Sequence, residues 1–167
     1  MEQRYITNTT EVRPDTASYS TVINAWARSR ERDATMRAEE VFRWSKEAYK
    51  YGNVNVKPNA LTYNSLINCY AKANQPDASD RAVELLDSMK ANALLEGFED
   101  CHPDVVTYTS VIDTLAKKAS LEASEKAESL LLELESSYDR NLDRRLKPNI
   151  RTYTSVRTAH SPRLVSC

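Results

Sequence analysis

Residues 57–67 read Lys-Pro-Asn-Ala-Leu-Thr-Tyr-Asn-Ser-Leu-Ile, and variants of this stretch recur three more times along the 167-residue chain. The other copies begin at Arg13, His102 and Lys147. The prolines lie at positions 14, 58, 103 and 148, so they are separated by 44, 45 and 45 residues. The tyrosines at positions 19, 63, 108 and 153 keep the same spacings. A register kept through four copies indicates a tandem repeat.

The second half of each unit repeats as well. An alanine followed three and four residues later by apolar residues begins 24 residues after each of the first three prolines, at Ala38, Ala82 and Ala127. The distance from this alanine to the next proline is 20, 21 and 21 residues. The one-residue difference therefore falls late in the unit, where a connecting loop tolerates it. We divide the chain into the tail of a preceding repeat (1–15), repeats 16–59, 60–104 and 105–149, and a truncated or aberrant fourth repeat (150–167).

Each half of a unit is predicted to be a helix. In the second unit, one apolar stripe at helical period comprises Tyr63, Leu66, Ile67, Tyr70 and Ala71. The β-branched segment 105–112 also suits a strand, but its apolar stripe continues to residues 115–116, past strand length. A single hairpin would expose its apolar stripes, so the units must stack. We predict an all-α fold, an α-solenoid of stacked antiparallel helix-turn-helix hairpins.

Helix starts and stops are marked in the sequence. Each repeated proline is followed by Asp or Asn, a good N-cap residue, at Asp15, Asn59, Asp104 and Asn149. Segment 124–145 lacks Gly and Pro, which predicts a long second helix in the third unit. After Val156 the apolar pattern fails, and His160-Ser-Pro ends the helix. We expect a piece of a longer array or an altered end, without a polar capping repeat.

Composition narrows the function classes. Only two glycines occur, which disfavours phosphate-cradling loops and tight-turn β folds. The net charge of −1 counts mildly against non-specific binding to polyanions, although a local basic cluster remains compatible with it. No apolar run is long enough for a membrane span, and the first residues carry no targeting pattern.

The reactive residues do not form a recognisable active site. Three cysteines, Cys69, Cys101 and Cys167, fit a reducing compartment better than a disulfide framework. Cys101 and His102 are adjacent in a predicted loop and lack a second ligand pair, so no metal site is predicted. No Ser/His/Asp or Cys/His set recurs. We therefore expect no enzyme activity and no cofactor, because catalysis would need an additional domain.

The repeated segment Leu61-Thr-Tyr-Asn-Ser-Leu-Ile-Asn, the Ala-x-x-hydrophobic second helix and the closing Pro-[Asp/Asn] together resemble the pentatricopeptide repeat family. The resemblance covers residues 13 to about 156. The units of 44–45 residues are longer than is usual for the family, with extra residues between the two helices and after the second. The Trp-x-x-Leu-Gly-x-x-Tyr pattern of tetratricopeptide repeats is missing.

The resemblance implies single-stranded RNA binding with one base per repeat. Its base-reading residues follow each tyrosine and each closing proline, which gives the pairs Ser20 with Asn59, Asn64 with Asp104, and Thr109 with Asn149. By family analogy these pairs read A-U-A, 5′ to 3′ along the chain. Asp and Asn suit uracil, whose N3–H donor is flanked by carbonyls. An amide such as Asn59 suits adenine, because it can both donate to N1 and accept from N6.

Two further sets of residues follow from the same resemblance. Residues that pack against the base faces are Ala17, Leu61 and Val106. Cations placed nine residues after each tyrosine, where they could follow phosphates, are Arg28, Lys72 and Lys117. The family also implies a role in RNA processing, stability or translation in a mitochondrion or plastid.

Plainer interpretations stay open. The six base-reading positions are also ordinary first-turn and cap residues, and the three cations also suit helix C-termini. A protein-interaction scaffold that uses the concave surface is the alternative function. Hydrogen-bonding residues at positions 20, 64 and 109, together with the cations, favour RNA, whereas an apolar or aromatic groove would favour protein.

Overall fold

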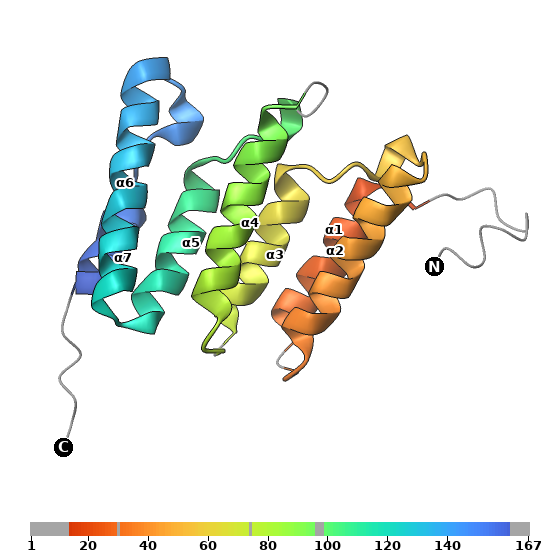
Figure 1. Ribbon diagram of the computed structural model, residues 1–167, viewed down its shortest axis with the longest axis horizontal. Helices are drawn as coiled ribbons and strands as arrows, with labels where there is room; N and C mark the ends of the chain where they lie inside the picture. The colour runs from red at the N-terminus through yellow and green to blue at the C-terminus, as the bar shows by residue number, and fades with distance from the viewer. Residues whose placement is uncertain (1–13, 30, 74, 96–98, 161–167) are drawn as a thin grey trace, which may run out of the picture.

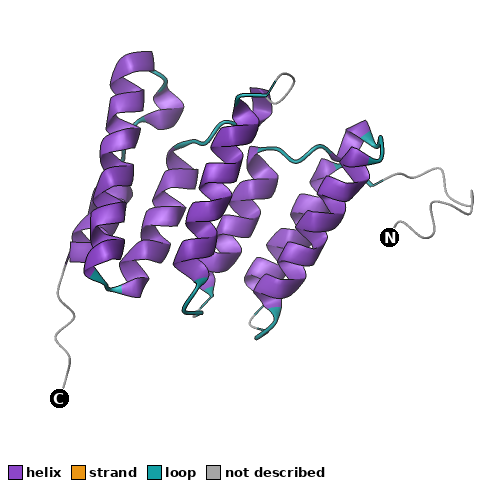
Figure 2. Cartoon of the chain, viewed as in Figure 1, coloured by secondary structure: helices purple, strands orange, loops and turns teal. Residues whose placement is uncertain are grey.

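The computed structural model describes residues 14–29, 31–73, 75–95 and 99–160, which form helices and connecting loops without a strand (Figures 1 and 2). Seven α-helices occur in this part of the chain: α1 (Thr16–Arg28), α2 (Ala34–Lys50), α3 (Ala60–Lys72), α4 (Ala78–Ala93), α5 (Val105–Lys118), α6 (Leu121–Asn141) and α7 (Ile150–His160). Short 3-10 turns η2 (Val54–Val56), η3 (Glu99–Cys101) and η4 (Arg144–Leu146) precede the helices α3, α5 and α7. The predicted all-α fold is confirmed.

The helices form two layers (Figure 1). In the first layer, α1 packs on α3, α3 on α5 and α5 on α7. The second layer contains α2, α4 and α6, and each of these helices packs on two first-layer helices. The four first-layer helices begin at the first residues of the four predicted repeats. This arrangement is a helical repeat solenoid, as predicted.

Capping boxes fix the starts of the first-layer helices. Asp15, Asn59 and Asp104 each accept a hydrogen bond from the backbone N–H three residues on, and the side chain of the Ser or Thr at that position accepts one from the backbone N–H of the capping residue. The side-chain hydrogen bond from Ser18 lowers the pKa of Asp15. Asn149 caps α7 in the same way, because its Oδ1 accepts from the N–H of Thr152 at 3.2 Å. The N-cap predictions are confirmed.

The core lies between the two layers. The alanines that open each second-half motif, Ala38, Ala82 and Ala127, are fully buried, so adjacent helices approach closely there. Tyr63 is also fully buried, and its ring meets that of Phe42 edge-on at a centroid distance of 5.0 Å. These contacts join the first unit to the second, so the core runs continuously through the stack.

The length of α6 and the position of Cys101 bear on two predictions made from the sequence. Helix α6, with 21 residues, is the longest described, as the absence of Gly and Pro from segment 124–145 predicts. Cys101, expected in a loop, instead closes the 3-10 turn η3 and is buried. Most of the predicted tail 1–15, the end of the fourth repeat from 161 to 167, and Cys167 lie outside the described residues.

A membrane-spanning helix and a cluster of metal ligands are both absent from the described residues. They contain no helix with the length and apolar character to cross a lipid bilayer. They also contain no group of three or more His, Cys, Asp or Glu side chains that could hold a metal ion.

Candidate nucleic-acid interface

The residues of each predicted base-reading pair meet at a junction between neighbouring units. At the junction of α3 and α5, Thr107 Oγ1 lies 2.7 Å from Asn64 Oδ1 and 2.9 Å from Asp104 Oδ1. Thr107 is fully buried and belongs to the capping box of α5. One threonine hydroxyl therefore connects the two members of the pair, although they are 40 positions apart in the sequence.

The other two junctions repeat this arrangement. Ser20 Oγ lies 3.1 Å from Thr62 Oγ1, which lies 3.2 Å from Asn59 Oδ1. Thr109 Oγ1 lies 2.9 Å from Thr152 Oγ1, which lies 3.4 Å from Asn149 Oδ1. All three predicted pairs are thus brought together through the threonine that precedes the tyrosine of the following unit.

The capping bonds determine which polar atoms remain available at the middle junction. Asn64 uses Oδ1 to accept from Thr107, and its Nδ2 makes no hydrogen bond with the described residues. Asp104 uses Oδ1 for its cap, and its Oδ2 likewise makes no hydrogen bond with the described residues. The junction therefore presents one N–H donor beside one charged acceptor.

The flanking junctions present donors only. Asn59 Oδ1 accepts from both the N–H and the hydroxyl of Thr62, at 3.2 Å each, so its oxygen is occupied. Asn149 Oδ1 is occupied in the same manner by Arg151 and Thr152. The sequence expectation that one amide would both donate and accept is not met in this structure, because the cap uses the oxygen. The amide N–H groups remain for a base acceptor such as adenine N1.

The members of the pairs differ in exposure. Ser20 and Thr109 are buried, with 3% and 5% of their surfaces accessible, because α1 packs closely on α3 and α5 on α7. Asn64, Asp104 and Asn149 are partly or fully accessible. At the two flanking junctions the accessible polar group is therefore the asparagine. The buried hydroxyl residue is connected to it through the threonine between them.

Residues assigned to base packing and to phosphate contact share one stripe on each helix. On α3, Asn68 follows Leu61 by seven residues and Lys72 follows it by eleven. This spacing places all three residues on one face of the helix. The same spacing relates Ala17 to Arg28 and Val106 to Lys117. Ala17, Leu61 and Val106 are exposed, as are the three cations.

Grooves connect these stripes. A groove of about 650 Å³ crosses α3, α5 and α7 and is lined by residues of these three helices alone, including Asn68, Lys72, Asp113, Lys117, Arg151 and Thr154. We call the surface of the first layer that carries this groove and the three exposed stripes the first-helix face. The second-layer helices contribute nothing to this groove, so the face is turned away from them.

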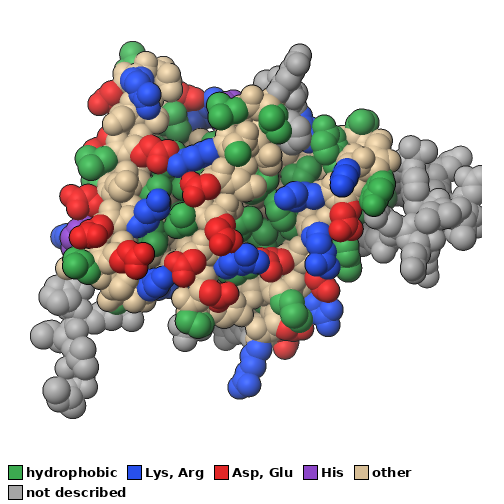
Figure 3. Space-filling model, viewed as in Figure 1, with side chains coloured by type: hydrophobic (Ala, Val, Ile, Leu, Met, Phe, Trp, Pro, Cys, Tyr) green, Lys and Arg blue, Asp and Glu red, His purple; other side chains and the backbone are tan. Residues whose placement is uncertain are grey.

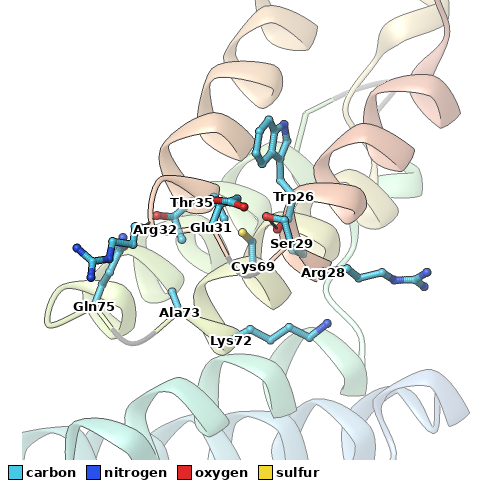
Figure 4. Close-up of a pocket in the computed structure, with 12 residues that line it drawn as sticks. Trp26, Arg28, Ser29, Glu31, Arg32, Thr35, Cys69, Lys72, Ala73 and Gln75 are labelled. Atoms are coloured by element: carbon cyan, nitrogen blue, oxygen red, sulfur yellow. Dashed lines mark hydrogen bonds between the residues drawn. The ribbon is translucent and has the colours of Figure 1, made fainter.

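The three cations form a row along the ends of α1, α3 and α5. A cavity of about 710 Å³ is lined by both Arg28 and Lys72, and in Figure 4 these two side chains extend to the same side. Lys72 and Lys117 line the next groove together. Lys117 Nζ also donates to the carbonyl of Ala71 near the end of α3, as a cation at a helix C-terminus does. The row can therefore stabilise helix ends and still present positive charge.

The fourth unit departs from the pattern. Arg151 occupies the position of the packing residues Leu61 and Val106, and its Nη2 lies 2.6 Å from Asp113 Oδ2. Ser155 also donates to Asp113. A guanidinium plane held by a carboxylate thus replaces an apolar side chain at this end of the face.

Comparison with protein families agrees with the repeat pattern. A family model described as PPR repeat family matches residues 58–117, and one described as Pentatricopeptide repeat domain matches residues 7–74. Together the two models extend over residues 7–117. The chain belongs to the pentatricopeptide repeat family. Its repeats therefore belong to a class that commonly binds RNA, that is generally non-enzymatic and that is often organellar. Comparison with curated proteins gave no match.

The sequence prediction overlooked the connecting threonines of this pentatricopeptide repeat protein. Thr62, Thr107 and Thr152 hold each pair together and are fully or almost fully buried. Their signal was present, because a Ser or Thr three residues after a capping Asp or Asn can complete a capping box. Asp113 and Arg151 were also missed, since their pairing depends on how α5 and α7 pack.

Proposed function

We propose that the chain binds single-stranded RNA selectively along the first-helix face, with one base at each junction between neighbouring units. The observation that carries the proposal is the repeated arrangement at three junctions, in which a buried threonine connects two polar residues. One such pair recurs in each repeat along the sequence. The exposed stripes beside them supply apolar contact for base faces and cations for phosphates.

The middle junction favours uracil. Its N3–H donor requires an acceptor, and Asp104 Oδ2 makes no hydrogen bond with the described residues. A uracil carbonyl requires a donor, and Asn64 Nδ2 is free. The flanking junctions present amide donors, which suit adenine N1. We accordingly propose A-U-A, 5′ to 3′ along the chain, as the preferred trinucleotide.

Three junctions give modest affinity. Base stacking or packing is worth roughly 1–3 kcal/mol per base, so three bases contribute about 3–9 kcal/mol before the entropic cost of binding. Titrations of the full chain therefore belong at low salt and high protein concentration, where phosphate contacts are strongest.

Asp104→Asn tests base reading at one position. Asparagine caps the equivalent helices at positions 59 and 149, so the variant keeps the fold and presents an amide N–H instead of a carboxylate oxygen. Cytosine N3 accepts from an N–H, whereas uracil N3–H does not. Using fluorescence anisotropy with CAUAC and CACAC RNAs, we expect the preference to move from U to C by about tenfold, since hydrogen bonds to charged groups contribute ~1.5–3 kcal/mol.

Asp77→Asn is the matched control. Asp77 precedes α4 as its N-cap but makes no side-chain capping bond, so this variant removes the same charge away from the junctions. It should keep the preference for U. If Asp104→Asn and Asp77→Asn select the same base, the proposed readout at this junction is wrong.

We also propose, from the family alone, that the protein acts in organellar RNA processing, stability or translation, in a mitochondrion or plastid. Imaging of the full-length gene product fused to a fluorescent protein tests the location. Sequencing of RNA crosslinked to it in cells identifies the transcripts, and a cytosolic signal would refute the organellar assignment.

A further inference from the structure

The two junctions between second-layer helices are closed differently. Between α4 and α6, Lys90 Nζ lies 2.6 Å from Glu133 Oε1. The hydroxyl of Tyr108 donates to the same carboxylate oxygen at 2.7 Å. A cation of α4, a carboxylate of α6 and a tyrosine of α5 thus close this junction with a part-buried network.

The equivalent network between α2 and α4 lacks its carboxylate. The repeat register aligns Lys46 with Lys90, and Ser88 with Glu133. Ser88 cannot form an ion pair, and it lies instead 3.4 Å from the hydroxyl of Tyr63. Lys46 forms no ion pair with the described residues, and its Nζ lies 5.5 Å from the ring centroid of Phe42. The cation is therefore present at this junction without the acid that its counterpart has.

A wide groove occupies this junction. Its volume is about 1290 Å³, and its apolar lining includes Met36, Phe42, Leu66, Leu85 and Leu95. Figure 3 shows hydrophobic side chains in the hollow between α2 and α4, with Lys and Arg side chains along the α2 side. The groove follows α2, whose 17 residues span about 25 Å at ~1.5 Å per residue. It can therefore accommodate an elongated apolar partner.

The charges that remain along the groove are mainly positive. Arg81 engages two of the lining acids, Glu39 and Glu84, at 2.9 Å each. A third, Glu40, lies 3.2 Å from Arg37. On the α2 side this leaves Glu47 and three cations without an ion pair among the described residues, namely Arg43, Lys46 and Lys50. The unpaired rim therefore carries three positive charges against one negative charge.

We propose that this groove, which we call the α2–α4 groove, binds an acidic amphipathic helix of a protein partner. The apolar face of such a helix covers the groove floor, and one of its carboxylates takes beside Lys46 the place that Glu133 has beside Lys90. Apolar anchors at positions i, i+3, i+4 and i+7 suit this geometry. Because the α2–α4 groove lies in the second layer, away from the first-helix face, this inference does not depend on RNA binding.

The test uses two labelled peptides of about 18 residues, long enough to span the groove. One has a leucine stripe at i, i+3, i+4 and i+7 with flanking glutamates, and the other has lysines in place of the glutamates. Anisotropy titrations with the full chain should show binding of the acidic peptide at least about tenfold tighter than that of the basic one, because complementary charges favour association and like charges oppose it.

Two variants locate the site. Lys46→Glu should weaken binding of the acidic peptide by about tenfold or more, since it places a like charge opposite the peptide. Ser88→Glu supplies the missing acid from within the chain and should pair with Lys46, which also weakens peptide binding. Lys126→Glu, on the exposed surface of α6, is the matched charge-reversal control and should change affinity less than about twofold. Far-UV circular dichroism checks that each variant is helical.

Three outcomes would overturn the proposal: no binding of the acidic peptide, equal binding of both peptides, or equal effects of Lys46→Glu and Lys126→Glu. An oligouridine RNA serves as a third probe. If it binds, and Lys46→Glu abolishes its binding while the acidic peptide does not bind, the α2–α4 groove is a polyanion site and not a docking site for a helix.

Discussion

Replacing Thr107 with valine removes one hydroxyl from the centre of the middle junction while keeping nearly the same side-chain shape. In the wild-type chain this hydroxyl lies 2.7 Å from Asn64 Oδ1 and 2.9 Å from Asp104 Oδ1, and it accepts from the N–H of Asp104 at 3.1 Å. The variant leaves a part-buried acceptor and a part-buried donor without these partners. Losses of this kind cost about 1–3 kcal/mol. The bond from the N–H of residue 107 to Asp104 survives, so α5 stays capped.

Thr114→Val is the matched control for this loss. Thr114 is also buried and lies on the same helix, but its hydroxyl bonds only to the carbonyls of Ser110 and Val111 within α5. Removing it leaves no partner from another unit unsatisfied. We expect Thr107→Val to lower the free energy of unfolding by about 1–3 kcal/mol, and Thr114→Val by less than about 1 kcal/mol.

Urea denaturation followed by far-UV circular dichroism measures both losses. An unchanged dependence of unfolding free energy on urea concentration would show that the denatured state is unaffected. Thr107→Val should also reduce the preference for U over C in the RNA titration, because Asn64 is no longer held. Equal destabilisation by the two variants would refute the reasoning that the threonine matters through its contact between units.

Three further predictions concern charge and reactivity. Lys72→Gln should lower the salt dependence of RNA binding by a slope of about 0.7, the value for one phosphate contact on a single strand; an unchanged slope in titrations at several salt concentrations would exclude that contact. Burial raises the pKa of Glu133, but hydrogen bonds from Lys90 and a tyrosine outweigh it and lower the pKa below its ordinary 4.5. The stabilising contribution of the ionised Glu133 is therefore complete above pH ~4.5 and is lost as pH falls through the lowered pKa. The unfolding free energies of wild type and Glu133→Gln should consequently converge in acid. A difference that stays constant with pH would contradict the lowered pKa. Burial raises the pKa values of the Cys69 and Cys101 thiols to about 11. Iodoacetamide at neutral pH should therefore label both thiols slowly in the native chain and rapidly in urea, as followed by peptide mass spectrometry. Equal labelling rates in the two conditions would contradict their burial.

Local chemistry explains what could be predicted from the sequence. A proline followed by Asp or Asn marks a helix start through bonds made within one turn, and α3 and α5 begin where Asn59 and Asp104 place them. The 3.6-residue apolar period likewise predicts which side of each helix is buried, as the full burial of Leu66 and Ile67 illustrates. Both signals are complete within about a dozen residues, so a single sequence is sufficient to predict them.

Contacts between units explain what could not be predicted. The burial of Ser20 follows from the close approach of α1 to α3, which no segment of either helix determines alone. The role of Thr62 is similar, because its local capping bond is readable in the sequence and its contact with Ser20 is not. The carboxylate missing at Ser88 becomes informative only after the structure shows Glu133 pairing with Lys90.

In this chain the packing of first-layer helices on one another, and not the length of a unit, sets the spacing of the junctions proposed to read bases. The segments after the second-layer helices, which contain η2, η3 and η4, are longer than the connections after α1, α3 and α5. First-layer helices therefore pack directly on one another, and hydroxyl groups meet at 3.1 Å between Ser20 and Thr62 and at 2.9 Å between Thr109 and Thr152. These hydroxyl contacts join first-layer helices only. A chain with 44- and 45-residue units can thus present its polar pairs at the interval of helix packing.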